Sequence, residues 1–458
     1  MRIFTREREF YRAFFRLMLF IALQNLLTYS VSLLDNMMLS WHDKAELNGA
    51  ALANQVQFLL QMIVTAAGEG IVVLGAQYWG EKRTEPIRSV ASAGLLTGVS
   101  FGLIFFVVMS VAPRGVLILL NDETDILAAG CRYMRIIRFT YPIWCLSTVL
   151  LATQRSVGNA RIGFAVMLMS LFVNLFFNWC LIFGKLGFHE MGIRGAAVAT
   201  LIARSFELAV ALIYTFRVDK KLRMKPKDML SRDARLWKDY RKYATPIMLG
   251  GASWGVAMFI QTAIIGSMKG DVISANTLAL NVFSVVSVFA YGGGNAAGVL
   301  TGKLIGENNP KLKEYVRTMQ ALFVLTGLVT GALIFAARLP VINLFRLETA
   351  KARSYASQFI LVLSLTSVGT AYQVACLTGI VRGGGLTKFV FYNDLIFQWG
   401  IILPLSLLAA YVWHLPPVWV FFILKSDQLL KCTVAAVEVN RYTWIRKLTR
   451  NKPAESAD

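Results

Sequence analysis

One acidic residue stands inside a long apolar stretch near the N-terminus. Asp35 lies in the segment YSVSLLDNMML, within a run long enough to cross a membrane. Placing an ionisable side chain at the centre of a bilayer costs about 3 kcal/mol or more, so such a residue is a candidate functional residue. A carboxylate in such a place is expected to hold a cation or a proton. Asp35 is therefore a candidate coupling residue; the alternative is a carboxylate held by neighbouring polar helices for packing alone.

Two asparagines farther along the chain have the spacing expected of partners for this carboxylate. Asn174 and Asn178, in VNLFFNWCLIF, are four residues apart and share one face of a helix. Thr200, in RGAAVAT, adds a hydroxyl on the next apolar segment. Hard cations are bound by such oxygen ligands. We therefore expect Asp35, Asn174, Asn178 and Thr200 to form one site for Na⁺ or H⁺, with interhelical hydrogen bonding as the alternative role of the asparagines.

A second group of polar residues is predicted to line a substrate cavity. Asn54, Gln57 and Gln61, followed by Thr65, form a polar stripe at helical spacing, which in a membrane helix should face the bundle interior or a wet cavity. Asp394 and Gln398 share a helix face in the C-terminal part and are predicted to line the same cavity there. Hydrogen bonding between helices is the simpler alternative for the stripe.

The elements that carry these residues are membrane spans. Of 458 residues, 56% are apolar and only 16% charged, with a mean hydropathy of +0.56. Apolar runs of roughly 20 residues, the length that crosses a bilayer core about 30 Å thick, follow one another along the whole chain. The sequence predicts an all-α polytopic membrane protein with twelve spans, at roughly 13–40, 50–78, 89–112, 134–153, 162–184, 195–216, 243–267, 275–304, 315–337, 356–380, 389–411 and 416–436.

The distribution of basic residues predicts the orientation. Most of the 47 Lys and Arg residues fall in alternate connections on one side of these spans, together with both termini. Basic residues collect on the cytoplasmic side, so both termini are expected in the cytoplasm of a cell-membrane protein. The net charge of +21 is then explained by topology and anionic lipid rather than by a nucleic-acid partner. The expected division is an N-lobe at 1–216, a basic connection at 217–242, a C-lobe at 243–436 and a basic tail at 437–458.

The two predicted halves repeat one another. Sliding the sequence by 226 residues pairs LANQV at 52–56 with LALNV at 278–282. The same offset aligns Gly68 with Gly294, Gly80-Glu81 with Gly306-Glu307, and Gly158 with Gly384. Two six-span repeats of one orientation place a substrate path at their interface. The same offset aligns Asp35 with Gln261, Asn174 with Gly400 and Asn178 with Pro404. Because the polar group of the first half has no such counterpart, the asymmetry favours function over architecture.

Other polar residues support weaker expectations. Arg204 and Glu207 are three apart and should pair with each other. Glu69, between two glycines near the cytoplasmic end of its span, either closes a gate or reaches the interface. The five cysteines are interpreted as packed apolar residues, and the three histidines fall in loops. No nucleophile, histidine constellation or metal-ligand spacing indicates an enzyme, and no cofactor beyond the coupling ion is expected.

These segments resemble the multidrug and toxic compound extrusion family. The segments that carry the resemblance are DNMML around Asp35, GAQYWG at 75–80, VNLFFNWCLIFG at 173–184, GIRGAAVAT at 192–200, GKLIGENNPKLKEYV at 302–316 and LTGIVRGGGLTK at 377–388. The resemblance implies two six-helix bundles in a V shape and export of drugs or metabolites, typically cationic or amphipathic, driven by Na⁺ or H⁺. It also implies a cation site at Asp35, Asn174, Asn178 and Thr200. Some members use acidic residues in the C-lobe; here those positions are Gln261 and Ala371, so coupling is expected to depend on Asp35, and Gln261 joins the expected cavity lining.

The predicted function is secondary active antiport of small organic molecules by a monomer. The alternative is a flippase for lipid-linked precursors, from a related branch of similar topology. A cavity for pyrophosphate-linked substrates should be strongly basic, and few Arg or Lys residues lie in the middle of the predicted spans. The sequence does not distinguish Na⁺ from H⁺, and it does not identify the substrate.

Overall fold

The computed structural model describes residues 4–121, 123–268, 270–345 and 349–450, and in these ranges every regular element is a helix. The first half contains α1 (Arg8–His42), α2 (Lys44–Gly80), α3 (Glu85–Val111), α4 (Pro113–Leu117), α5 (Thr124–Ile137), α6 (Thr140–Ser156), α7 (Ala160–Ile182), α8 (Ile193–Ile213) and η1 (Tyr214–Val218). The connection holds η2 (Pro226–Leu230). The second half contains α9 (Ala234–Gly266), α10 (Gly270–Val286), α11 (Val288–Gly306), α12 (Leu312–Phe345), α13 (Ala350–Gln373), η3 (Val374–Val381), α14 (Thr387–Leu395), η4 (Ile396–Ile402), α15 (Leu403–Leu407), η5 (Leu408–Val412), α16 (Pro417–Lys425) and α17 (Asp427–Arg441).

Helices occupy all twelve positions predicted for spans, but three of them are interrupted. In the described ranges, nine helical segments are long and apolar enough to cross a membrane, and two bent pairs raise this to eleven. The pairs α5–α6 and α10–α11 bend by 56° and 44°. The second bend lies at Ser287, whose hydroxyl donates to the carbonyl of Phe283, a contact that bends helices. The twelfth position breaks at Ser426 between α16 and α17, next to charged residues.

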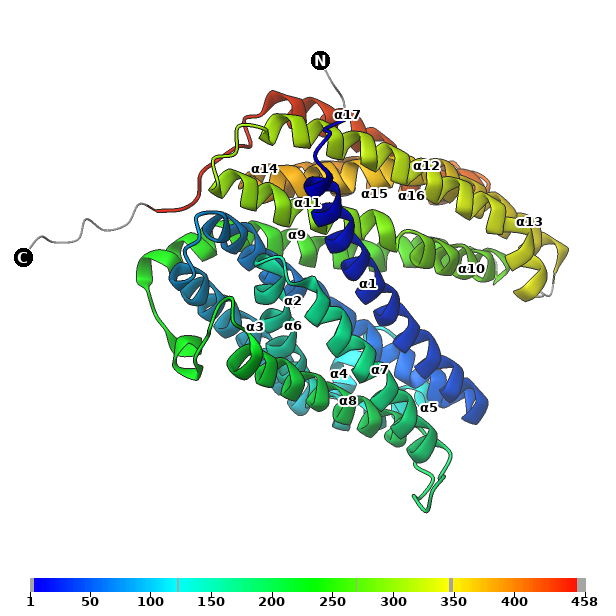
Figure 1. Ribbon diagram of the computed structural model, residues 1–458. Helices are drawn as coiled ribbons and strands as arrows, with labels where there is room; N and C mark the ends of the chain where they lie inside the picture. Colours follow the sequence, from blue (N-terminus) through cyan, green and yellow to red (C-terminus); the bar gives the residue numbers. More distant parts are fainter. Residues whose placement is uncertain (1–3, 122, 269, 346–348, 451–458) are drawn as a thin grey trace, which may run out of the picture.

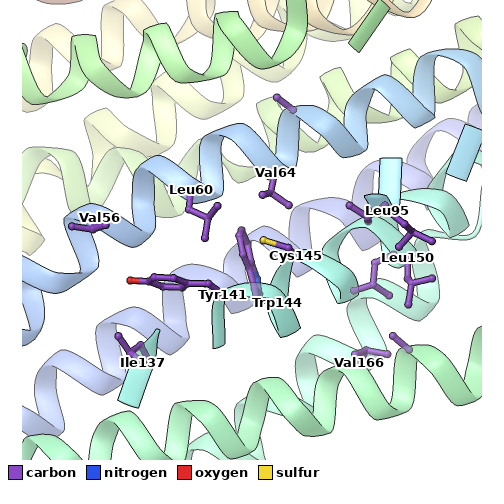
Figure 2. Close-up of a cluster of buried hydrophobic side chains, with 14 of the residues drawn as sticks. Val56, Leu60, Val64, Leu95, Ile137, Tyr141, Trp144, Cys145, Leu150 and Val166 are labelled. Carbon is purple, nitrogen blue, oxygen red and sulfur yellow. The ribbon is translucent and has the colours of Figure 1, made fainter. Parts of the chain in front are cut away.

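The helices form two groups, which Figure 1 shows converging on the left and diverging towards the right. One core contains Met38, Leu39 and most buried residues of α2 to α8, and others contain the buried residues of α10 to α17. Figure 2 shows part of the first core, with Trp144 and Cys145 of α6 near Leu60 and Val64 of α2. Cys145 is fully buried among apolar side chains, in agreement with the packing role expected for the cysteines.

The first helix of each group begins in the core of the other group. Phe10, Phe14 and Met18 of α1 belong to the core of α11 to α17, and Phe10 stacks on Tyr315 of α12 at 4.6 Å. In α9, Tyr240 lies in the first core, and its hydroxyl donates to the carbonyl of Ala67 at 3.0 Å. The predicted lobe boundaries therefore stay a prediction, because α1 and α9 each contribute to both cores.

At one end of the molecule, glycines bring the two groups into backbone contact. We call this the basic end, because it carries the α2–α3 turn, the connection at 219–233 and the C-terminal segment. A Cβ atom added at Gly80 would lie 2.2 Å from the carbonyl oxygen of Lys303, and one at Gly306 only 2.0 Å from that of Gln77. Gly80 and Gly306 are partners in the 226-residue repeat. Equivalent glycines therefore meet across the seam between the two groups.

We expect Gly306→Ala to destabilise this structure by about 1–3 kcal/mol, the usual cost of overpacking. The Cβ would collide with backbone, which cannot turn away as a flexible side chain can. Thermal unfolding of the purified protein checks this. Gly266→Ala is the matched control, because a Cβ at Gly266, the last residue of α9, meets nothing within 4 Å. Equal melting temperatures for the two variants would contradict the described seam.

The described portion of the tail predicted at 437–458 is packed against the rest of the protein. Helix α17 extends to Arg441, and Tyr442 ends it in the left-handed conformation with a φ of 58°. Trp444 is fully buried, and its ring lies so close to Gly384 that a Cβ there would approach it to 2.3 Å. Residues 442–450 therefore belong to the folded structure, while 451–458 lie outside the described residues.

Candidate functional site

Helix α1 brings Asp35 against α7, as the pattern of the two asparagines predicted. The Nδ2 atom of Asn178 donates to Oδ1 of Asp35 at 2.5 Å and to Oδ1 of Asn174 at 3.1 Å. Asn174 and Asn178 are both buried, whereas Asp35 is partly exposed. Three of the four predicted site residues thus form one hydrogen-bonded chain.

Two polar atoms in this chain are buried without a partner: Oδ1 of Asn178 and Nδ2 of Asn174. Leaving buried polar atoms unpaired is unfavourable by roughly 1–3 kcal/mol each. The assignment of oxygen and nitrogen in an asparagine amide follows from its hydrogen bonds. If the Asn178 amide turns over, its oxygen joins those of Asn174 and Asp35 on one side, which is a donor set for a hard cation. In the described residues no cluster of three His, Cys, Asp or Glu side chains offers an alternative metal site.

The fourth predicted residue, Thr200, is not part of this hydrogen-bonded chain. Its hydroxyl faces that of Tyr133 on α5, and Tyr133 in turn interacts electrostatically with Asp35 and Arg204. None of the hydrogen bonds in the described part joins Thr200 to Asp35 directly. Tyr133 was missed in the sequence because it falls just before the span predicted at 134–153, and α5 in fact begins ten residues earlier at Thr124.

A buried ion pair lies beside this group. Nη1 of Arg204 is 2.6 Å from Oε2 of Glu207, which confirms the predicted pairing along α8. The other carboxylate oxygen of Glu207 accepts from the hydroxyl of Ser147 on α6 at 2.7 Å. Arg204 also attracts the negative charge of Asp35. The positive charge of Arg204 is thus already balanced by Glu207, so Asp35 has no dedicated counter-ion among the described residues.

The polar stripe of α2 is separate from Asp35. Asn54, Gln57 and Gln61 are each partly exposed, and none has a hydrogen-bond partner in the described structure. Gln261 on α9 is buried, with 6% of its surface exposed. These side chains are free to bond to water or a ligand, and their place in a cavity lining stays a prediction.

The second half has a charged cluster of its own. Nζ of Lys431 lies 2.9 Å from Oδ1 of Asp394 and 3.5 Å from Oδ2 of Asp427. Asp394 was predicted to line the cavity; its side chain is 40% exposed, but its charge is paired with Lys431. Gln398 is buried, with an unpaired Nε2 atom, and it lines a small pocket with Asp394, Lys431 and Trp254. The charges of Asp427 and Lys431 were visible in the sequence, but the pairing of Lys431 with Asp394 across two helices was not.

Glu69 of α2 joins the two groups near the basic end. Its Oε1 atom accepts from Nη2 of Arg155 at 2.5 Å, and its Oε2 atom accepts from Nη2 of Arg382 at 3.3 Å. Arg155 belongs to α6 in the first half, and Arg382 follows η3 in the second half. All three side chains are at most 16% exposed. Of the two roles expected for Glu69, this geometry does not agree with reaching the interface, and closing a gate stays a prediction.

Comparison with known proteins covers nearly the whole chain. The family model described as MatE matches residues 21–180 and 246–408. The "Probable multidrug resistance protein NorM" of Thermotoga maritima is 24% identical over 440 residues, which cover 94% of this chain and 93% of the relative. The counterpart from Geobacillus kaustophilus is 25% identical over 422 residues, covering 87% and 88% of the two chains.

Solved structures show the same fold. The D35N mutant of the Vibrio cholerae MATE transporter VcmN superimposes with a TM-score of 0.86 at 14% identity, covering 96% of this chain and 98% of that one. A multidrug resistance MATE family transporter in an outward-facing conformation gives a TM-score of 0.83 at 18% identity, covering 95% of this chain and 98% of that one. These findings confirm the fold class predicted from the sequence. With the family model matching most of the chain, this protein belongs to the MatE family of membrane transporters.

Proposed function

We propose that this protein is an antiporter that exports small organic molecules in exchange for Na⁺ or H⁺, with Asp35 as the coupling residue. The observation that supports this most directly is the Asp35–Asn178–Asn174 chain. A carboxylate surrounded by amides and without its own counter-ion is poorly stabilised as an anion in a low-dielectric bundle. It therefore takes up a proton or a cation, and binding one excludes the other.

Coupling follows if the ion and the substrate favour different conformations. A ligand shifts a conformational equilibrium only through its differential affinity for the two states. In this structure Glu69 and the glycine seam join the two groups at the basic end, and the groups diverge towards the opposite end. Transport then requires these contacts at the basic end to break in the alternate conformation. The driving force is sufficient, because one charge that crosses 100 mV contributes about 2.3 kcal/mol.

Efflux from proteoliposomes under separately imposed Na⁺ and pH gradients tests the proposal. We expect one of the two gradients to drive accumulation of a fluorescent organic cation against its own gradient. Uptake that follows only the substrate's own gradient under both conditions would contradict ion-coupled antiport.

Replacing Asn178 should distinguish the two ions. Asn178→Ala removes one oxygen of the proposed cation donor set, whereas a proton on Asp35 needs no oxygen cage. If Na⁺ drives transport, we expect the concentration of Na⁺ for half-maximal rate to rise at least tenfold. If H⁺ drives transport, the rate should change less than threefold. Ser170→Ala on the same helix is the control, because its hydroxyl bonds only to the backbone of Ala203.

We place the basic end in the cytoplasm of a cell-membrane protein, because basic connections collect there. A single cysteine at Lys227, introduced into a background without the five native cysteines, should resist impermeant maleimide in intact cells. A cysteine at the exposed Phe188, in the α7–α8 loop at the other end, should react. The reverse pattern would invert the proposed topology.

A further inference from the structure

A groove between α9 and α14 at the basic end carries three basic side chains without ion-pair partners. It is lined by Arg241, Lys242, Thr245, Pro246, Leu249, Lys388, Phe391 and Tyr392 and has a volume of about 320 Å³. That volume reaches the range of pockets that hold small ligands. No acidic residue lines the groove, and in the described structure Arg241, Lys242 and Lys388 pair with no carboxylate. Three uncompensated cations on two helices attract an anion.

The sequence repeat supplies an internal comparison. At an offset of 226 residues, Pro246 on α9 corresponds to Phe20 on α1. In the first half, the ring of Phe20 packs against Phe164 of α7 at 5.8 Å, and the guanidinium of Arg161 lies over it at 5.3 Å. Aromatic rings thus fill the space between α1 and α7. The smaller proline leaves the corresponding space between α9 and α14 open.

The lining has two different parts. Arg241, Lys242 and Lys388 are exposed on the side of the connection at 219–233. Leu249 lies about two turns farther along α9 than Arg241, and Phe391 lies about one turn farther along α14 than Lys388. Leu249 is 52% and Tyr392 56% exposed at the surface of the helices. A cationic rim beside an apolar floor matches a ligand with an anionic head and a hydrocarbon tail. Basic pockets between membrane helices on the cytoplasmic side bind lipid head groups in this way.

We propose that the α9–α14 groove binds the phosphate head group of an anionic glycerophospholipid from the cytoplasmic leaflet. Arg241, Lys242 and Lys388 contact the phosphate, and the acyl chain lies along Leu249 and Phe391. The assignment to that leaflet rests on the proposed orientation of the protein. The binding itself does not depend on ion coupling, so it can be tested whether or not transport is observed.

Native mass spectrometry of the full-length protein tests the site with phosphatidylglycerol as the probe. Replacing Arg241, Lys242 and Lys388 by Gln should weaken binding at least tenfold. The charge-matched control replaces Lys220, Arg223 and Lys227 by Gln and should stay within twofold of the parent, because these residues lie outside the groove. Pro246→Phe, which fills the groove as Phe20 fills its counterpart, should also weaken binding while all cations remain.

Three outcomes would overturn the assignment. Unchanged binding in both the triple variant and Pro246→Phe would place the lipid elsewhere. Equal binding of phosphatidylcholine would remove the role of the cations. Equally tight binding of glycerol 3-phosphate would identify a site for a free phosphate rather than for a lipid.

A second, independent inference concerns the C-terminal segment 442–450, which crosses the seam. It leaves α17, and the backbone N–H of Arg446 donates to the carbonyl of Gly384 at 3.2 Å. It then reaches α2, where Gln77 donates to the carbonyl of Arg446 at 3.1 Å and accepts from the N–H of Leu448 at 2.8 Å. Figure 1 shows this end of the chain passing from the upper to the lower group.

The far end of the segment is held by charge. Two guanidinium nitrogens of Arg450 donate to the two carboxylate oxygens of Asp239, at 2.5 and 2.8 Å. These hydrogen bonds raise the pKa of Arg450 above its ordinary value, so the pair stays charged at physiological pH. Thr449 and Lys447 both bind Oε1 of Glu81, at 2.5 and 3.0 Å.

We infer that residues 442–450 are a strap that must detach from α2 when the basic end opens. A reversible cross-link tests this in a background without native cysteines. The test requires that this cysteine-free background protein transports substrate. A disulfide between Gln77→Cys and Leu448→Cys should reduce transport at least tenfold, and reductant should restore it. The control disulfide, Glu438→Cys with Thr443→Cys, joins side chains 2.7 Å apart within one group and should leave transport unchanged. Full transport by the oxidised Gln77–Leu448 variant would overturn the inference.

Discussion

Asp35→Asn is expected to abolish gradient-driven efflux while the protein still folds. The amide is nearly the same size as the carboxyl group and carries no charge, so its burial costs less than that of the carboxylate. It can still bond to Asn178, because that amide can turn over to present its oxygen to the new donor. It cannot release a proton or balance the charge of a cation. Without ion binding at this position, the ion gradient cannot shift the conformational equilibrium of the transporter. We expect at least a hundredfold loss of efflux in proteoliposomes and no loss of thermal stability.

Two comparisons make this result specific. Asp125→Asn, at the exposed start of α5, removes the same charge from a residue without a described partner and should transport like the parent. Downhill equilibration of substrate by Asp35→Asn is compatible with the proposal, because alternating access itself does not require the carboxylate. Accumulation of substrate against its gradient at the parent's rate would refute Asp35 as the coupling residue.

The second large effect is expected at the seam. Glu69→Gln removes the only carboxylate that forms an ion pair with Arg155 and Arg382 within the described residues, and it leaves two largely buried guanidinium groups without that partner. Breaking a buried pair by removing one partner costs about 3–5 kcal/mol. The loss falls on the conformation in which the two groups meet, so the equilibrium should shift towards an open basic end. A shift of this size changes the population ratio by more than a hundredfold.

Distances between spin labels report this change. With cysteines at the exposed Lys227, on η2, and Lys313, on α12, Glu69→Gln should add a population at longer distance. The matched control is Glu85→Gln, at the exposed start of α3, which should keep the parent's distribution. An unchanged distribution in Glu69→Gln would mean that the seam is held by glycine packing and the C-terminal strap alone.

Much of the fold could be predicted because its determinants are local. The length and apolarity of each run place the twelve helical positions, and the i, i+4 spacing places Asn174 and Asn178 on one face whatever the helix packs against. The bends were not predictable in the same way. The bend between α10 and α11 falls at Ser287, whose hydroxyl bonds to the carbonyl of Phe283, and the charge of Lys431 in α17 is balanced by two carboxylates, one of them on another helix.

The sequence by itself determined the class of protein, the repeat and the residues that can carry a coupling ion. Each of these depends on composition or on spacing along one helix. Only the tertiary structure decided which side chains meet: Asp35 with Asn178, Glu69 with Arg382, and Gln77 with the strap are contacts between residues 143, 313 and more than 360 positions apart. The contacts across the seam accompany a close backbone approach at Gly80 and Gly306, where even a Cβ atom would not fit, and no local pattern encodes that approach. Thr200 shows the same limit, because helix packing places its hydroxyl beside Tyr133 instead of Asp35.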